Sequence, residues 1–541
     1  MRLLYWQAVT ILNPHLSQGT KDFHGASVVL EPLAWIGTDG GLIPALAAEV
    51  PTIENGGIAA DYTSITWKLK EGVKWSDGTD FTSDDVVFTY EYISDDATGA
   101  TTAQTVVGVE SVEAVDPLTV RVNFEGPNAN PYQIFVSQLG LIIQRAQFGD
   151  FMGAKAGDAP GNQGPIGTGP YKVADFRPGD VVVYEINENY RDPNKPFFKE
   201  VELKGGGDAP SASRAVCQTG EFDYGWNIQV EWSALQPIVE GSGTQCDIVV
   251  AVSPNVERIL LNQTNPSSSL SEEQRSEPGN PHPFLSDLKV REALAMAIDR
   301  EALDGLYGEA GEPTCNILPK LAWVGQEPFT GGADSMPICA NDIAAANAQL
   351  DAAGWTRGGD GIRQKDGVRM SITYSTSINS LRQKEQAIVK ENWEALGLEV
   401  ELIAVDASVF FGVEGPDTIG RFYWDTMMYT NGAESADPTN YLSGWECDQI
   451  RTRADNWSGN NQERYCSEEY DALLDQLRTE LDAEKRADLI VQLNDHLAEN
   501  VVNIPLVART SPTSVAAKDI NGYEPNPFDS ELLNIGDWTR D

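Results

Sequence analysis

The stretch from Tyr62 to Ile93 constrains the fold most tightly, because it predicts a strand, a turn and a capped helix in succession. Tyr62–Leu69 is rich in β-formers, and polar and apolar residues alternate in its second half. Asp77-Gly78 is a turn dipeptide. Thr82 followed by Asp85 has the spacing of a capping box. The apolar positions that share one helical face after it are Val86, Tyr90 and Ile93.

Further motifs follow in order along the chain. They are Gly164–Tyr171 (GPIGTGPY), Asn187–Tyr190 (NENY), Phe284–Asp287 (FLSD), Val290–Arg300 (VREALAMAIDR) and Asp437-Pro438. Together with WKLKEGVKWSDGTDFTSDDVVF at 67–88, they resemble the signatures of the family 5 (peptide/nickel type, cluster C) extracellular solute-binding proteins of ABC importers. Arg191 departs from that pattern, since the family has an aromatic residue there. The motifs indicate a family, but they do not identify a ligand.

The resemblance implies an α/β chain with the two-lobed type II periplasmic-binding-protein fold and an extra N-terminal subdomain. We therefore expect residues 1–255 to form lobe I, with an inserted subdomain at about 41–175. Residues 256–503 would form lobe II, and residues 504–541 would return to lobe I. Two chain crossings between lobes act as a hinge, so closure around a ligand in the cleft is expected.

Hydrophobic periodicity predicts several elements of the second half of the chain. We expect helices at 343–353 and 381–396, a helical pair over 470–499, and strands at 256–262, 369–374 and 398–405. The resemblance implies that 256–262 is the first crossover between the lobes, and 504–507 is expected to be the second. Asp342 is the expected N-cap of the first of these helices.

The charge balance excludes one large class of partners. The chain has 38 basic and 81 acidic residues, a formal net charge of −43. Such a surface repels phosphate backbones and anionic lipids, so nucleic-acid binding is excluded as a main role. The acidity indicates a solvated surface of the kind adapted to salt, and the alternative is attraction of cationic ligands. The acidic residues are spread along the chain and mark no site.

No stretch approaches the ~20 apolar residues of a membrane span. Met1 is followed by a strand-like Leu3–Trp6 rather than by an export signal. Either the protein is cytoplasmic or the signal has been removed. We expect export to the periplasm or the extracellular side, with the mature protein free or lipid-anchored.

The six cysteines support export. None has CxxC spacing, so thiolate zinc sites and thioredoxin-type chemistry are not indicated. Six cysteines permit 15 pairings in principle, but they fall into three couples that are local in sequence. The predicted disulfides are Cys217–Cys246, Cys315–Cys339 and Cys447–Cys466. Disulfides need an oxidising compartment; the alternative is six unpaired buried thiols in a cytosolic protein.

Signals for an enzyme are poor. The four histidines show no HExxH spacing, and no GxSxG elbow or GxxxxGK[ST] loop occurs. Carboxylates are too abundant for any chosen pair to indicate a glycosidase. Asp360-Gly361 and Asp366-Gly367 lack the ligand spacing of an EF-hand. We therefore expect no catalytic residues, no metal and no cofactor.

The loop before Pro438 is the best binding signal. In peptide binders of the family, an aspartate four residues before this proline pairs with the ligand's α-ammonium, and Glu434 holds that place here. A carboxylate in a dry cleft forms strong charge-assisted hydrogen bonds. The alternative is a solvated loop acid. We expect Asp437 to shape the loop.

A second family feature is missing. Dipeptide-binding relatives clamp the ligand carboxylate with an arginine in the loop before the helix that ends near Trp393. That place falls near Thr376 and Ser377, where no arginine occurs. Arg382 follows several residues later, and we expect it on the helix surface. This departure favours longer peptides, or a ligand without a carboxylate, over strict dipeptides.

Aromatic residues supply the remaining candidates, since their rings cover peptide side chains or stack on sugars. The resemblance places these residues in segments that border the cleft: Tyr5, Trp6, Asn13, Thr20, His24, Trp226, Asn227, Trp424, Tyr441, Trp445 and Trp457. Of these we expect Trp226, Trp424 and Trp445 to line the pocket.

The leading hypothesis is a monomeric, non-enzymatic receptor that captures an oligopeptide-like solute between two lobes and delivers it to an ABC permease in the membrane. The missing arginine and the aromatic residues favour an oligosaccharide receptor on the same fold as the alternative. A secreted hydrolase is the third candidate, and it lacks a recognisable acid–base pair.

Overall fold

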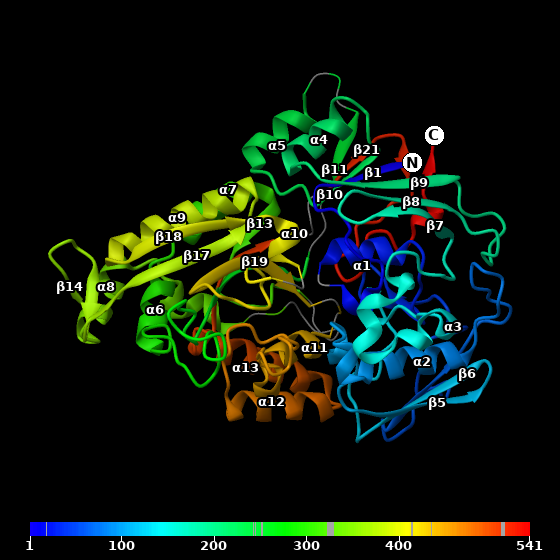
Figure 1. The fold of residues 1–541 in the computed structure, drawn as a ribbon, viewed down its shortest axis with the longest axis horizontal. Helices are drawn as coiled ribbons and strands as arrows, with labels where there is room; N and C mark the ends of the chain where they lie inside the picture. The colour runs from blue at the N-terminus through cyan, green and yellow to red at the C-terminus, as the bar shows by residue number, and fades with distance from the viewer. Residues whose placement is uncertain are drawn as a thin grey trace.

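A computed structural model describes residues 1–541 except residues 18, 242, 244, 250–252, 322–328, 330, 413–414, 434, 436 and 510–513. Figure 1 shows a mixed α/β molecule with two lobes: the blue to green segments as far as β11 and the red C-terminal segment build lobe I, on the right and at the top, and the later green to orange segments build lobe II, on the left and below. Both chain ends lie in lobe I.

Lobe I is organised by a mixed sheet, called sheet I, with seven strands among the described residues. Their spatial order is β11 (Cys246–Val249), β21 (Ser514–Ala517), β10 (Tyr224–Trp226), β1 (Arg2–Tyr5), β9 (Glu200–Gly205), β8 (Val181–Ile186) and β7 (Tyr171–Arg177). The opening strand β1 is central and runs parallel to both neighbours, with Tyr5 opposite Trp226. The sheet packs on helices α1 (Thr20–Ser27), α4 (Ala209–Cys217) and α5 (Trp232–Val239).

Lobe II is organised by sheet II, which has six strands in the described part of the chain. Their order is β13 (Gly311–Pro313), β20 (Asn503–Arg509), β12 (Asn255–Leu261), β19 (Thr426–Gly432), β17 (Ser371–Ser377) and β18 (Glu399–Val405). The helices of this lobe are α6 (Leu288–Met296), α7 (Arg300–Tyr307), α8 (Ile343–Ala352), α9 (Ser380–Leu396), α10 (Ala407–Phe410), α11 (Thr439–Leu442), α12 (Glu468–Thr479) and α13 (Ala483–Glu499).

The predicted strand–turn–helix unit is present in the smaller sheet of lobe I. Strands β4 (Ser64–Lys68), β6 (Thr119–Phe124) and β5 (Val109–Asp116) form that sheet, and α2 (Ser83–Ser94) and α3 (Arg145–Phe148) lie beside it. Helix α2 begins with the expected capping box, in which the Thr82 and Asp85 side chains each accept from the other residue's backbone N–H. Trp67 and Trp75 are buried in the core below.

The remaining strands are short. They are β2 (Ala34–Ile36) with β3 (Leu42–Pro44), β14 (Thr356–Arg357) with β15 (Arg363–Lys365) and β16 (Val368–Arg369), and β22 (Ile520–Asn521) with β23 (Thr539–Arg540).

The chain passes between the lobes on neighbouring strands. It leaves sheet I at β11 and enters sheet II at β12, then leaves sheet II at β20 and re-enters sheet I at β21. β11 pairs with β21 and β12 pairs with β20, both antiparallel, so the strands that lead into and out of the two passages are neighbours in each sheet. The predicted crossover strands are therefore strands of sheet II next to the passages. The domain boundaries 1–255, 256–503 and 504–541 stay a prediction.

All six cysteines form the predicted disulfides. Cys217–Cys246 joins α4 to β11, with Cα atoms 4.8 Å apart. Cys315–Cys339 and Cys447–Cys466 lie in lobe II, with Cα separations of 6.0 and 4.6 Å. Each closes a short loop, for which a contribution of roughly 2–4 kcal/mol is typical. Among the described helices, none combines the length and the apolar character needed to cross a bilayer.

Candidate functional site

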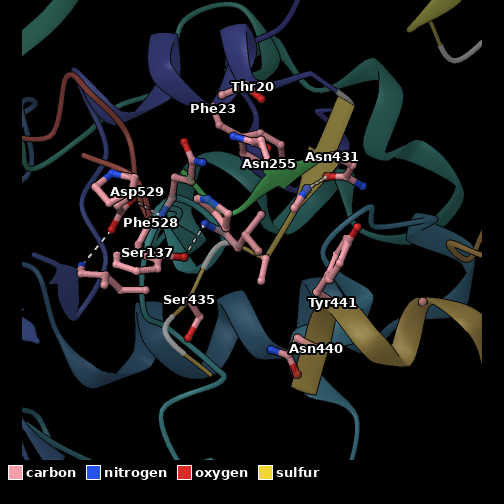
Figure 2. Close-up of a pocket in the computed structure, with 18 of the residues that line it drawn as sticks. Thr20, Phe23, Ser137, Asn255, Asn431, Ser435, Asn440, Tyr441, Phe528 and Asp529 are labelled. Carbon is pink, nitrogen blue, oxygen red and sulfur yellow. Dashed lines mark hydrogen bonds between the residues drawn. The ribbon is translucent and has the colours of Figure 1, made fainter. Parts of the chain in front are cut away.

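A cavity of about 1010 Å³ lies between the lobes and is lined from both. Its volume is at the upper end of the range of ligand pockets, roughly 300–1,000 Å³. Figure 2 shows Ser137, Phe528 and Asp529 of lobe I on one side of the cavity and Asn431, Asn440 and Tyr441 of lobe II on the other.

The lobe I wall is built on a stack of aromatic side chains. Trp226, at the end of β10, lines the cavity and stacks on Tyr5 of the adjacent strand with ring centroids 4.7 Å apart. His24 of α1 meets the edge of Trp226 at 5.4 Å, and its Nδ1 lies 3.0 Å from the Tyr5 hydroxyl. Burial lowers the pKa of His24 to about 3, so the imidazole is neutral at physiological pH. This wall therefore holds Trp226 rigidly without using a charge.

Two acids stand beside these rings. The Asp529 carboxylate accepts from the backbone N–H groups of Ile36 and Gln138, both at 2.9 Å. Glu531 Oε2 accepts from the Tyr224 hydroxyl and from Ser514 Oγ, whereas its Oε1 has no partner within the described structure. Burial raises the pKa of Glu531 to about 7. Glu531 can thus donate or accept a hydrogen bond toward the cavity.

The lobe II wall includes an unpaired strand edge. β19 pairs with β12 along its length, but β17 pairs with β19 only at Thr426–Met428. From Tyr429 to Gly432, that side of β19 has no neighbouring strand among the described residues, and these residues line the cavity. The free edge is therefore turned to the place where a ligand would sit.

Five buried arginines also line this wall. Arg486 pairs with Asp437, and the other four are here called the arginine face: Arg258, Arg382, Arg451 and Arg509. Arg382 Nε lies 2.8 Å from Glu257 Oε1, and Arg509 Nη1 lies 3.4 Å from Glu257 Oε2. One carboxylate thus serves two guanidinium groups. The prediction that Arg382 lies on the helix surface is wrong. The Arg382 side chain is 2% exposed, because it pairs with Glu257 on β12 in the interior.

Arg258 is surrounded by aromatic rings. Its Nη1 donates to the Tyr441 hydroxyl at 3.0 Å. The guanidinium carbon lies 5.4, 5.9 and 5.6 Å from the ring centroids of Tyr429, Tyr441 and Trp445. Cation–π attraction stabilises the charge here, by ~2 kcal/mol or more for desolvated contacts. Tyr441 and Trp445 therefore contribute to the wall chiefly by holding Arg258.

The loop before α11 is held by its own ion pair. Asp437 accepts from the Thr439 N–H at 3.0 Å and pairs with Arg486 of α13. Glu434, the predicted ammonium anchor, lies outside the described residues.

Comparison with known proteins identifies the family. Residues 41–451 match the family described as bacterial extracellular solute-binding proteins, family 5. The chain belongs to this family. Its members bind solutes and are not enzymes, as the sequence predicted.

Individual relatives of this family 5 protein are distant in sequence. Protein XP55 of Streptomyces lividans is 29% identical over 393 residues, which are 72% of this chain and 64% of XP55. The oligopeptide-binding protein AppA of Bacillus subtilis is 25% identical over 493 residues, 90% of this chain and 81% of AppA.

Solved structures agree on the fold. AppA in complex with a nonapeptide superposes with a TM-score of 0.83 at 22% identity, over 100% of this chain and 99% of AppA. NikZ from Campylobacter jejuni in complex with Ni(L-His) gives 0.81 at 22% identity, over 100% of this chain and 99% of NikZ. The family 5 chain thus has the type II periplasmic-binding-protein fold that its motifs implied.

The structure brings together seven of the predicted site residues. Those that line the cavity are Thr20, His24, Trp226, Asn227, Asp437, Tyr441 and Trp445. Three others lie behind the wall. Tyr5 is fully buried under Trp226, and Trp6 donates from Nε1 to the Asn227 carbonyl at 2.7 Å. Trp424 stacks on Phe410 at 5.7 Å in a separate core cluster, so it does not line the cavity.

Sequence reasoning missed Arg258, Arg451 and Glu531. A signal existed for the first of these: Glu257 and Arg258 interrupt the otherwise apolar strand β12, and charges in a buried strand need partners. No comparable signal marks Arg451 or Glu531. Among the described residues, one group of potential metal ligands occurs: Cys315, Asp334 and Cys339. Its two cysteines are joined in a disulfide and therefore offer no thiolate.

Proposed function

We propose that this protein is a receptor of an ABC importer that captures peptides in the inter-lobe cavity and delivers them to a membrane permease. The observation that carries the proposal is the free edge of β19 inside the cavity. A strand edge offers alternating N–H and C=O groups, which an extended peptide can pair with irrespective of its side chains. A sugar offers no such matching repeat.

Other groups around the edge support the proposal. The amides of Asn255 and Asn431 line the cavity beside β19, and each can both donate and accept. The rings of Trp226 and Tyr441 supply apolar surface for side chains. AppA, which shares the fold, holds a nonapeptide in its solved structure. The cavity volume also favours ligands longer than dipeptides.

Capture would follow closure of the lobes about the two passages. The lobes already touch beside the cavity: the Ala129 N–H donates to the Arg478 carbonyl at 2.9 Å, and Lys384 of α9 pairs with Glu231 next to α5. Both contacts must break before a ligand can leave. The proposed bodies are residues 1–255 with 504–541, and residues 256–503.

Within this scheme Glu434 would bind the peptide's ammonium group, Asp437 would hold the loop, and Trp226 and Trp445 would shape the pocket. The receptor would act as a monomer outside the cytoplasmic membrane, either free or lipid-anchored. The three disulfides support an oxidising compartment.

Mass spectrometry of material that co-purifies with the protein, followed by calorimetry with peptide and oligosaccharide libraries, tests the proposal. We expect peptides to co-purify, peptides to bind, and small-angle scattering to show a more compact particle with a binding peptide. Binding of oligosaccharides but no peptide, or turnover of a chromogenic hydrolase substrate, would overturn the proposal.

A further inference from the structure

The disulfide Cys447–Cys466 closes a loop that forms part of the cavity wall. The two cysteines are 19 positions apart in the chain, and the segment 447–466 is here called the disulfide loop. Three residues of this loop line the cavity: Arg451, Asn460 and Gln462. The chain that leads into Cys447 also lines the cavity. One covalent bond therefore joins the two arms of the chain that carry this part of the wall.

The disulfide loop has little regular structure of its own. The structure describes every residue of it and shows one short 3₁₀ turn, η13 (Cys447–Gln449), and one isolated bridge between Ile450 and Asn461. Arg464 has a φ angle of 56°, in the left-handed region. A residue other than glycine keeps such a conformation only where the surrounding contacts fix it. The shape of the loop therefore depends on its anchors.

Hydrogen bonds from one buried side chain hold the base of the loop. Asn461 is fully buried, and its Oδ1 accepts from the Tyr465 N–H at 3.1 Å. Its Nδ2 donates to three backbone carbonyls, at 3.2 Å for Trp445, 3.0 Å for Glu446 and 2.7 Å for Tyr465. Each hydrogen bond contributes little net stability, because water replaces it when it opens. These bonds can hold the loop only while the two arms stay close together.

The disulfide keeps the two arms together and connects them to a helix. Its Cα atoms are 4.6 Å apart. Cys466 is followed by Ser467, the N-cap of α12, and the Cys447 N–H donates to Asp471 of the same helix at 3.3 Å. Opening the disulfide would restore the chain entropy that a closed ring suppresses. The residues of the loop that line the cavity would then lose their fixed positions.

This disulfide is also the most accessible of the three to a reductant. Cys466 is exposed and Cys447 is partly exposed. In contrast, Cys217, Cys246 and Cys315 are at most 1% exposed, so each of the other two disulfides includes a fully buried cysteine. Thiol–disulfide exchange requires a thiolate to reach a sulfur atom, and exposed disulfides are the labile ones. A dithiol should therefore reduce Cys447–Cys466 first.

We propose that the Cys447–Cys466 disulfide is a positioning element of the binding site and a site of thiol–disulfide exchange, so that its reduction weakens ligand binding and leaves the lobes folded. The inference rests on the proposed function, and it deepens that function by naming a covalent bond that controls the cavity wall.

The exchange step uses a dithiol as the reductant. One thiolate of the dithiol attacks Cys466 Sγ, the S–S bond breaks, and Cys447 leaves as a thiolate that takes up a proton. The second thiolate of the dithiol then displaces Cys466, which also takes up a proton. The dithiol is oxidised to a disulfide while the disulfide of the protein is reduced to two thiols, and the two protons of the dithiol pass to the cysteines.

Proteolysis tests the loop without any ligand. Dithiothreitol is added to the ligand-free protein until alkylation and mass spectrometry detect thiols at Cys447 and Cys466 alone. We expect trypsin to cleave after Arg451 and Arg453 about tenfold faster in the reduced protein, because the loop opens locally, while the circular dichroism spectrum stays unchanged. Equal cleavage of the two forms, or reduction of another disulfide first, would overturn the inference.

Calorimetry then tests the binding site with the co-purifying peptide identified by mass spectrometry. We expect this peptide to bind about tenfold more weakly to the reduced protein and to the double variant Cys447→Ser with Cys466→Ser, mainly through faster dissociation. The matched control is Cys217→Ala with Cys246→Ala, which removes a disulfide whose residues do not line the cavity. This control should lower the thermal unfolding midpoint and keep the affinity within about threefold, because the two sites are independent.

Two results of the calorimetry would refute the inference and leave the receptor proposal intact. One is equal affinity of the oxidised and reduced proteins for the peptide. The other is a loss of affinity in the control as large as that in Cys447→Ser with Cys466→Ser, since the effect would then be general destabilisation.

A redox titration supplies a readout that a purely structural disulfide would not change. If reduction weakens binding about tenfold, bound peptide must stabilise the disulfide against reduction by the same factor. That factor corresponds to a reduction potential about 30 mV lower for this two-electron couple. We expect saturating peptide to produce this shift for Cys447–Cys466 and no shift for Cys217–Cys246. No shift with a peptide that binds would reject the inference alone. If an oligosaccharide co-purifies instead and produces the shift, the inference stands and the peptide receptor is rejected.

Discussion

The two walls of the cavity solve the problem of burying polar groups in different ways. In lobe I, His24 is neutral, Glu531 has a raised pKa, and Asp529 is bonded to backbone N–H groups. In lobe II, the arginines stay charged and outnumber their acids. The comparison teaches that the lobe I wall buries its polar groups in neutral or backbone-bonded form, whereas the lobe II wall keeps charged guanidinium groups against aromatic rings and a shared carboxylate.

The strongest way to break the comparison is to remove Glu257, the acid that forms ion pairs with two arginines of the arginine face. Glu257→Gln leaves Arg382 and Arg509 without a carboxylate, and breaking a buried pair in this way costs about 3–5 kcal/mol. We expect a loss of that size in the free energy of unfolding, measured in guanidinium chloride. Glu399→Gln, which removes an exposed partner of Arg369, is the control and should have little effect. Similar losses in the two variants would show that the arginine face is not strained by unpaired charge.

The lobe I wall depends on packing instead. Trp226→Ala removes a ring that stacks on Tyr5 and contacts His24, and large-to-small core substitutions of this kind cost about 3 kcal/mol or more. We expect that loss in the same unfolding assay, together with loss of peptide binding in calorimetry. Trp457→Ala, outside the cavity, should leave peptide affinity unchanged. Unaltered peptide binding by Trp226→Ala would remove Trp226 from the site.

The pH dependence of the free energy of unfolding compares one buried glutamate from each lobe. Glu385 in lobe II and Glu531 in lobe I have folded-state pKa values raised to about 8 and about 7, mainly by burial. At a pH below the unfolded-state pKa, each glutamate is protonated in both the folded and the unfolded protein. As the pH rises above that value, the glutamate ionises in the unfolded protein first, so the free energy of unfolding falls until the pH reaches the folded-state pKa. We expect Glu385→Gln to gain about 1–3 kcal/mol relative to the unaltered protein between pH 5 and 8. Glu531→Gln should gain less and reach its full effect near pH 7. Parallel stability–pH curves for all three proteins would contradict this expectation.

Glu434 sharpens the comparison, since it would add an acidic anchor to the cavity wall that carries the arginine face. Glu434→Gln should weaken a peptide with a free N-terminus about tenfold, equivalent to ~1.4 kcal/mol. An N-acetylated peptide should bind the variant and the unaltered protein alike. If the free and acetylated peptides respond equally to the substitution, Glu434 does not bind the ammonium group.

Local sequence rules predicted much of the secondary structure. Helix α8 starts after Asp342, α9 covers Ser380–Leu396 against an expected 381–396, and the capping box at Thr82 is formed. These features depend on residues three or four positions apart, so periodicity and capping suffice to locate them. The disulfides were predictable for a similar reason, because each couple is local in the chain.

The walls of the cavity were less predictable, because long-range neighbours decide them. Arg382 is buried only because Glu257 lies beside it, 125 residues earlier in the chain. Trp226 and Trp424 are alike in sequence context, yet Trp226 faces the cavity while Phe410 covers Trp424. Which side of a strand meets the ligand depends on how the two lobes face each other, and no local pattern encodes that.

One detail of β19 bears on how long a guest stays bound. β19 ends at Gly432, where any Cβ would collide with the carbonyl of Pro254, the residue before β12. The edge available to a peptide therefore runs directly up to the pivot between the lobes. A peptide paired with this edge would extend across the pivot and oppose opening of the lobes. A longer peptide would oppose that opening more strongly. We expect residence time, rather than the rate of capture, to increase with peptide length.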